Sequence, residues 1–175
     1  RAMAAFTGYS LWLMPEGQSS EDLSSLIKGV SQEHGARAFE PHVTLLPGVQ
    51  TTAEEAVRVT QALASELKPF EIHLSDVASG DSFFQCVLAR CTPDMAIMEA
   101  NKQAEKAFAA FEFNKRAFVP HMSLLYSDMP EGARKEAAEK LNSDWKERSF
   151  LVDKIHVYDT NGPVDNWKCV GTIPL

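Results

Sequence analysis

Two histidines in this chain stand in nearly identical surroundings, and each is followed two positions later by a hydroxyl side chain. The first lies in RAFEPHVTLL, residues 37–46, and the second in RAFVPHMSLL, residues 116–125. Arg, Ala, Phe, Pro, His and both Leu recur in register, and Thr44 corresponds to Ser123. We interpret the two stretches as equivalent strands of a duplicated half, with His42 and His121 as the matching imidazoles.

The alternation of side chains along a strand decides which residues act together. Successive side chains point to opposite faces, so His42 and Thr44 share one face while Val43 takes the other. His121 and Ser123 share a face for the same reason. Two copies from a duplicated half would face each other across a shared cleft, so the repeat predicts two imidazoles and two hydroxyls that converge.

This set of groups favours phosphodiester chemistry. A metal site would more often include Asp or Glu, and hydroxyls are poor zinc ligands. A Ser-His-Asp arrangement needs only one His, together with an orienting acid. In-line displacement at phosphorus needs a base for the attacking oxygen and an acid for the leaving oxygen. One neutral and one protonated imidazole can fill both roles near neutral pH, while the hydroxyls hold the non-bridging oxygens.

The apolar pattern along the chain predicts an α+β protein. Strands are expected over 7–14, 42–46, 70–78, 82–90, 119–126, 149–159 and 167–175. Helices are expected near 23–30, over 51–67 after a Thr cap, over about 95–111 and over about 131–141. The turn signal Ser79-Gly80-Asp81 predicts a hairpin, so the sheets should be antiparallel and carry helices on one side.

Charge and length restrict the partners. The chain has 175 residues and a net charge of -7, which argues against a broad basic surface for long nucleic acid. No apolar run approaches the roughly 18 to 20 residues that cross a bilayer, and no secretory leader is visible. We therefore expect a monomer in the cytosol or nucleus, with no membrane partner. Residues 1–5 contain RAMA in place of an initiator Met and are interpreted as an expression remnant before one domain over 6–175.

The three cysteines do not suggest a metal or disulfide framework. Cys86, Cys91 and Cys169 lack C-x-x-C spacing and are odd in number. They are expected to be reduced thiols, mostly in core positions.

The paired Pro-His-x-Ser/Thr-Leu strands resemble the two signature motifs of the 2H phosphoesterases. YSLWLMPEG near the start, SFFQCVLA in the middle and PHMSLLY resemble the plant and fungal cyclic phosphodiesterases of that superfamily. The resemblance is most extensive from Tyr9 to Tyr126 and is limited to the strand pattern after that. It implies a bilobed fold with pseudo-twofold symmetry, in which two antiparallel sheets flanked by helices hold the active-site cleft between them.

The resemblance also implies an activity and roles for single residues. The activity is hydrolysis, without metal or cofactor, of ADP-ribose 1″,2″-cyclic phosphate and of nucleoside 2′,3′-cyclic phosphates to 2′-phosphates, so the partner is a small cyclic phosphate. By position, His42 and His121 are the catalytic pair, Thr44 and Ser123 bind phosphate, and Trp12 and Tyr126 line the cleft. By analogy with relatives, His121 is the general base and His42 the general acid. A base or ribose is expected to stack on the aromatic rings.

Several cleft residues have more than one interpretation. Trp12 is also compatible with a core position, and Tyr126 with a hydroxyl anchor for its strand. Phe83 and Phe84 should point to opposite faces of a strand, so at most one reaches the cleft. Gln85 shares a face with Phe83 and is a candidate substrate ligand.

The remaining histidines and the repeated arginines have structural interpretations. His73 and His156 are expected at structural or surface positions, and His34 near a helix end, where a cation is favourable. Arg37 and Arg116 lie five residues before the repeated histidines. A structural ion pair is the expectation for both.

Two other functions remain open from the sequence. One keeps the chemistry and changes the substrate to a 2′,5′-linked oligonucleotide or an RNA 3′ end, although the acidic composition offers little sign of a basic track. The other is a nucleotide-binding module that has lost catalysis, which the retention of both histidines and both hydroxyls disfavours.

Overall fold

The computed structural model describes residues 5–175, so the remnant expected over 1–5 lies outside the described residues except for Ala5. The elements are β1 (Tyr9–Leu13), α1 (Gly17–Glu33), β2 (Val43–Val49), α2 (Ala53–Ala64), β3 (Phe70–Ser82), β4 (Gln85–Cys91), α3 (Met95–Ala107), β5 (His121–Leu125), α4 (Glu131–Asp144), β6 (Arg148–Val152), β7 (Lys154–Asp159), the 3₁₀ turn η1 (Val164–Asn166) and β8 (Lys168–Pro174). They confirm the α+β class. The expected Thr cap is also present, because the Thr52 hydroxyl accepts a hydrogen bond from the Glu55 amide at 3.3 Å.

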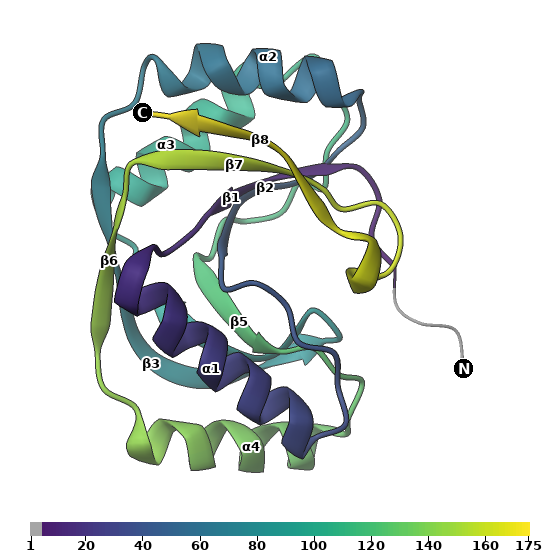
Figure 1. Ribbon diagram of the computed structural model, residues 1–175, viewed down its shortest axis with the longest axis vertical. Coiled ribbons are helices and arrows are strands. Elements are labelled where there is room, and N and C mark those ends of the chain that lie inside the picture. The colour runs from purple at the N-terminus through teal and green to yellow at the C-terminus, as the bar shows by residue number, and fades with distance from the viewer. Residues whose placement is uncertain (1–4) are drawn as a thin grey trace.

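The strands form one curled antiparallel sheet in the order β6-β3-β4-β5-β2-β1-β7-β8 (Figure 1). Its two four-stranded halves, β6-β3-β4-β5 and β2-β1-β7-β8, correspond to the two sheets expected from the sequence. They are joined through β2 and β5, the repeated strands, at the single register pair Val43 and Met122. The centre of the sheet is therefore the place where the two copies of the repeat meet.

The helices are exchanged between the halves. α2 packs on β7 and β8 and α4 packs on β3 and β4, so each covers its own half. α1 follows β1 along the chain but packs on β5, and α3 follows β4 but packs on β2. Figure 1 shows α2 and α3 at one end of the molecule, α4 at the other, and α1 crossing in front. Because each half is covered partly by a helix from the other, the halves form one body.

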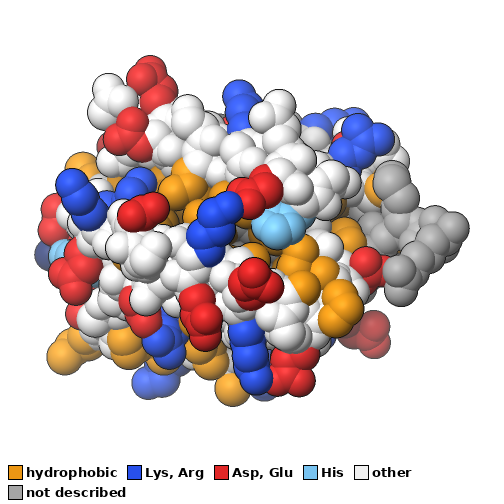
Figure 2. All heavy atoms as spheres, turned by 90° about the horizontal axis from the view of Figure 1, so that it is seen from below, with side chains coloured by type: hydrophobic (Ala, Val, Ile, Leu, Met, Phe, Trp, Pro, Cys, Tyr) orange, Lys and Arg blue, Asp and Glu red, His pale blue; other side chains and the backbone are white. Residues whose placement is uncertain are grey.

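Charged side chains of both signs lie on the outer surface (Figure 2). α4 is tied to α1 by an ion pair between Lys140 and Glu33. On the face seen from below in Figure 2, acidic and basic side chains are interspersed and do not gather into a basic track. None of the helices within residues 5–175 is long and apolar enough to cross a membrane.

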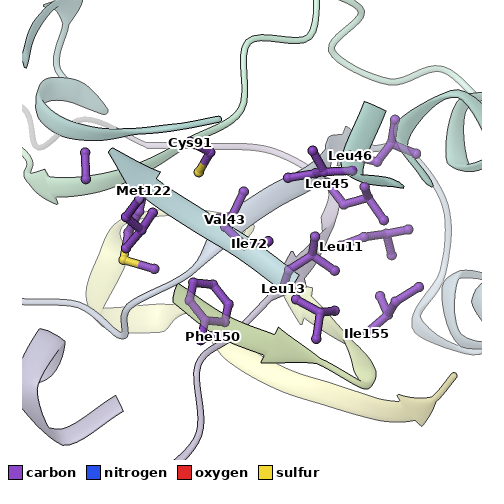
Figure 3. Packing of buried hydrophobic residues seen from close by; sticks show 14 of the residues in the cluster. Leu11, Leu13, Val43, Leu45, Leu46, Ile72, Cys91, Met122, Phe150 and Ile155 are labelled. Carbon is purple, nitrogen blue, oxygen red and sulfur yellow. The ribbon is translucent and has the colours of Figure 1, made fainter. Parts of the chain in front are cut away.

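The hydrophobic core follows from strand alternation. Leu11 and Leu13 of β1, Val43 and Leu45 of β2, and Met122 of β5 are fully buried. Figure 3 shows these side chains packed with those of neighbouring strands. Burying such side chains contributes roughly 1.5 to 3 kcal/mol each. Their sequence neighbours in the same strands must point to the opposite face, where the repeated histidines lie.

The stretch 149–159 differs from the single strand that was expected. It forms β6 and β7, which lie in opposite halves of the sheet because β6 pairs with β3 and β7 with β1. Its buried positions have even numbers up to Val152 and odd numbers from Ile155 onward. This one-residue change of phase marks a break at Asp153, after which the chain returns to the first half.

The hairpin of β3 and β4 also differs from the expectation. β3 extends past the predicted turn at 79–81, and the tip consists of Phe83 and Phe84. The register of β3 against β4 shifts before the tip, so Gly80 lies in a β-bulge. A Cβ at this position would lie 1.8 Å from the carbonyl oxygen of Gln85, which explains why the residue is glycine.

Candidate active site

A cleft of about 510 Å³ lies where the two halves of the sheet meet. Its wall includes both repeated strands, and His42, Thr44, His121 and Ser123 all line it. The structure thus brings together the four polar groups of the repeat. His42 and Ser123 are buried, at 5% and 6% exposure, so their polar atoms are available to a ligand only from the cleft.

The register of β2 against β5 gives this arrangement a near-twofold symmetry. Val43 is paired with Met122 in the antiparallel ladder. Continuing that register by one residue sets each histidine opposite the hydroxyl residue of the other strand. Opposed residues of antiparallel strands share a face, and diagonal neighbours lie about 7 to 8 Å apart. His42 and His121 are diagonal neighbours of this kind, so both imidazoles belong to the same face and line the same cleft.

A backbone carbonyl fixes each imidazole ring. His42 Nδ1 lies 2.7 Å from the carbonyl oxygen of Glu40. His121 Nδ1 lies 2.8 Å from the carbonyl oxygen of Val119. A carbonyl oxygen only accepts, so Nδ1 carries the hydrogen in both rings and donates it. Nε2 is left to exchange a proton with a ligand, and in both copies a proline separates the acceptor residue from the histidine.

Burial sets the charge of the two rings. It lowers the pKa of His42 to about 4, with the Glu40 carbonyl acting in the opposite direction and His121 lowering the pKa further. Burial also lowers the pKa of His121, against the effect of the Val119 carbonyl. Both rings are therefore neutral near pH 7 in the free protein, which differs from the expected pair of one neutral and one protonated ring. A bound phosphate anion would raise both pKa values, because negative charge favours the imidazolium.

The two hydroxyls are in different states. The Ser123 hydroxyl donates to the carbonyl oxygen of Phe84 at 2.7 Å. The Thr44 hydroxyl has no hydrogen-bond partner within residues 5–175. Thr44 can therefore donate to a ligand at once, whereas Ser123 must exchange the carbonyl for the ligand.

Residues 7–175 match the family described as cyclic phosphodiesterase-like protein. The chain belongs to this family. A cyclic phosphodiesterase of Arabidopsis thaliana is 29% identical over 175 residues, which cover 95% of this chain and 94% of that protein. A 2′,3′-cyclic-nucleotide 3′-phosphodiesterase of Yarrowia lipolytica is 29% identical, covering 94% of this chain and 98% of that protein.

Solved structures support the same fold. The crystal structure of E. coli LigT complexed with 3′-AMP matches with a TM-score of 0.63 at 13% identity, covering 97% of this chain and 98% of that chain. The family match and the shared fold confirm the resemblance to the 2H phosphoesterases, the predicted fold class and the prediction of a phosphodiester hydrolase.

In this cyclic phosphodiesterase-like fold, Trp12 lines the cleft but has no free ring face. One face stacks on His42, with ring centroids 3.5 Å apart and planes 6° from parallel. The other face stacks on Tyr158 at 3.8 Å. Only 3% of Trp12 is exposed, so the stacking of a base or ribose expected from the sequence finds no open surface there. The contact instead holds the His42 ring in place.

Tyr126 also forms part of the wall. Its ring stacks on Phe39 at a centroid distance of 3.7 Å, and Phe84 meets it edge-on at 5.2 Å. Burial raises its pKa, so the phenol stays protonated. Its hydroxyl has no hydrogen-bond partner in the described part of the chain, so the anchoring role considered from the sequence is not seen.

The hairpin tip brings more residues to the cleft than expected. Gln85 lines it, as the sequence suggested, and so do both Phe83 and Phe84. The expectation that only one phenylalanine reaches the cleft was wrong, because these residues form a turn and do not alternate as a strand does. Phe84 also packs against Trp167 at 5.7 Å and Phe6 at 5.6 Å, two cleft residues that the sequence did not single out.

The two repeated arginines differ. Arg37 forms an ion pair with Asp165 at 3.5 Å, as expected. Arg116 lines the cleft and has no ion pair within residues 5–175, so the expectation was wrong for this residue. The segment that carries it, between the end of α3 and the start of β5, runs along the cleft outside regular secondary structure.

The other histidines lie outside the cleft wall. His73 pairs with Asp94, with His73 Nδ1 2.9 Å from a carboxylate oxygen. His156 is half-buried and lies 3.4 Å from the Thr172 hydroxyl. His34 is the C-terminal cap residue directly after α1. These positions confirm the structural and surface interpretations, and His73 is a natural control because it too is followed by x-Ser.

Proposed function

We propose that this protein hydrolyses nucleoside 2′,3′-cyclic phosphates to 2′-phosphates, and ADP-ribose 1″,2″-cyclic phosphate, without a metal ion. The observation that carries the proposal is the pairing of His42 and His121 in one cleft, each with Nδ1 bound to a carbonyl and Nε2 left for a ligand. The names of the relatives support it, since one is a cyclic phosphodiesterase and another a 2′,3′-cyclic-nucleotide 3′-phosphodiesterase. The E. coli LigT structure contains 3′-AMP, a small nucleotide.

In the proposed reaction, His121 Nε2 takes a proton from water as the water oxygen attacks phosphorus. The bond between phosphorus and the 3′ oxygen breaks, and His42 Nε2 gives a proton to that oxygen. His121 is the more exposed ring and therefore meets water more easily. The low pKa of His42 makes its imidazolium a strong proton donor once the bound phosphate has allowed it to form. Thr44 and Ser123 would hold the non-bridging oxygens.

The donor set of the cleft supports a reaction without metal. Among residues 5–175, no three His, Cys, Asp or Glu side chains come together in a way that could hold a metal ion. Cys86 and Cys91 are buried and Cys169 is exposed, all as free thiols. The proposed chemistry therefore relies on the imidazole and hydroxyl groups of the cleft.

The test is turnover of 2′,3′-cyclic AMP in the presence of EDTA, with the product identified by chromatography. We expect undiminished hydrolysis and adenosine 2′-phosphate as the product. Loss of activity in EDTA would show a metal requirement, and adenosine 3′-phosphate would show that the other ester bond is cut. No turnover at all would favour the inactive binding module.

The oligonucleotide alternative finds less support in the cleft. Of the described residues that line it, Arg116 is the only Lys or Arg, while Asp81 and Glu105 are negative. A single-stranded nucleic acid needs a positively charged groove along its backbone. A short, locally bound substrate fits this wall better.

Removing the hydroxyls should weaken phosphate binding. Thr44→Val keeps the shape and loses the donor, so we expect kcat/KM for 2′,3′-cyclic AMP to fall about 10- to 100-fold, since a hydrogen bond to a charged group contributes about 1.5 to 3 kcal/mol. Ser123→Ala should lower kcat/KM by a smaller factor, because the Ser123 hydroxyl must break its hydrogen bond to the Phe84 carbonyl before it can bind the phosphate. Ser75→Ala, which removes a hydroxyl of β3 outside the cleft wall, is the matched control. Equal kinetics for Thr44→Val and the unmodified protein would refute the phosphate contact.

A further inference from the structure

Arg116 is the basic side chain of the cleft wall that the proposed mechanism does not use. It is exposed, and it has no hydrogen bond or ion pair within residues 5–175. The other charged residues of the described wall, apart from the histidines, are Asp81 and Glu105. The described wall therefore has a net negative charge and one arginine without a partner. A bound anion would be stabilised most beside that arginine.

The repeat offers an internal comparison. Arg37 occupies the equivalent position in the first copy, but it is neutralised by Asp165 and does not line the cleft. Both copies thus keep the arginine, but its surroundings differ, because Arg37 has an acidic partner whereas Arg116 lines the cleft. In a chain with a net charge of -7, acidic partners for a second arginine are plentiful, yet Arg116 has none in the described part of the chain.

Arg116 reaches the cleft from outside the repeated strands, in the segment between the end of α3 and the start of β5. In the proposed reaction, the phosphate that is hydrolysed already has two imidazoles and two hydroxyls as partners. Arg116 is therefore available to a second group of the substrate.

We propose that Arg116 binds a second phosphate of the substrate, attached at the 5′ position of the ribose whose cyclic phosphate is hydrolysed. A guanidinium presents a planar fork of donors that matches phosphate oxygens. A plain 2′,3′-cyclic nucleotide carries one negative charge, whereas a cyclic phosphate with a 5′-phosphate or diphosphate carries further charges beyond the ribose. Arg116 thus makes the enzyme prefer substrates of the second kind, an inference that rests on the proposed function.

The test uses two substrates that differ only in the second phosphate, namely 2′,3′-cyclic AMP and its 5′-phosphorylated form. The measured quantity is the ratio of their kcat/KM values. Arg116→Gln is expected to lower the preference for the 5′-phosphorylated substrate about 5- to 10-fold, and Arg116→Lys to restore part of it by keeping the charge. The preference should also shrink at high ionic strength, because an exposed charge is screened.

Arg37→Gln is the matched control and should leave the ratio unchanged, since it alters the same residue of the other copy outside the cleft. If the ratio of kcat/KM values for Arg116→Gln lies within two-fold of the ratio for the unmodified protein, the inference is overturned while the proposed function stays intact. A binding measurement, which needs no turnover, tests the inference separately from the proposed function. By calorimetry, Arg116→Gln should weaken the binding of adenosine 2′,5′-bisphosphate more than the binding of adenosine 2′-monophosphate. An equal loss of affinity for the two nucleotides would reject the inference, whether or not the protein hydrolyses either substrate.

Discussion

Replacing either His42 or His121 by Asn is expected to lower kcat/KM for 2′,3′-cyclic AMP by about 10²- to 10⁴-fold, the usual contribution of a general acid or base. Asn keeps a donor close to the position of Nδ1, so the hydrogen bond to Glu40 or Val119 can persist. It has no counterpart of Nε2, so proton transfer is lost. The fall should therefore appear in kcat, with KM changed only a few-fold, in steady-state kinetics.

His73→Asn is the control for these variants, because His73 has the same x-Ser context in β3 and its side chain is exposed outside the cleft wall. It should keep activity within two-fold. His42→Asn also removes the ring that stacks on Trp12, so thermal unfolding must be recorded to show that the variant is folded. A folded variant of either repeated histidine that retains more than a tenth of the activity would rule out the two-histidine scheme.

The pH dependence is expected to be bell-shaped, with its maximum in kcat/KM on the acidic side of neutrality. The scheme needs one protonated and one neutral imidazole, and kcat/KM follows the pKa values of the free protein. Burial lowers the pKa of His42 from 6.5 to about 4 and also lowers that of His121. The singly protonated pair is therefore most populated below pH 6.5, and kcat/KM should fall about ten-fold per pH unit on the alkaline limb.

The profile of kcat should be displaced to higher pH than that of kcat/KM. In the complex the phosphate anion favours the imidazolium, so both pKa values rise. The measurement is initial rates between pH 4 and 9 at constant ionic strength, with circular dichroism at each pH to confirm the fold. His73→Asn should reproduce the same curves. A rate that climbs steadily from pH 5 to 9 is incompatible with an acid and a base acting together.

The sequence predicted the centre of the molecule well, because one repeat carried most of the information. Strand alternation alone placed each histidine on the same face as the hydroxyl residue two positions later, and the structure puts all four in one cleft wall. The helices were predictable because their apolar spacing and the Thr52 cap are local signals. These features depend on residues close together in the chain.

Other features of the site depend on contacts between distant residues and left no comparable signal. Trp12 was identified as a cleft residue, but its burial between His42 and Tyr158 depends on which strands flank β1. Phe6 and Trp167 reach the cleft from opposite ends of the chain. The carbonyl partners of the histidines did have a local signal, namely the proline that precedes each histidine.

The strand order has a consequence for how the protein is made. The half of the sheet that carries His42 combines β1 and β2 with β7 and β8, while everything from β3 to β6 is inserted between them (Figure 1). During synthesis on the ribosome, the inserted half can pair its strands first, but one edge of β1 stays open until β7 emerges. Tyr158, which stacks on Trp12 behind the His42 ring, arrives only then. A nascent or truncated chain that stops before β7 carries both histidines but lacks the strand that pairs with β1 and the Tyr158 ring that stacks on Trp12.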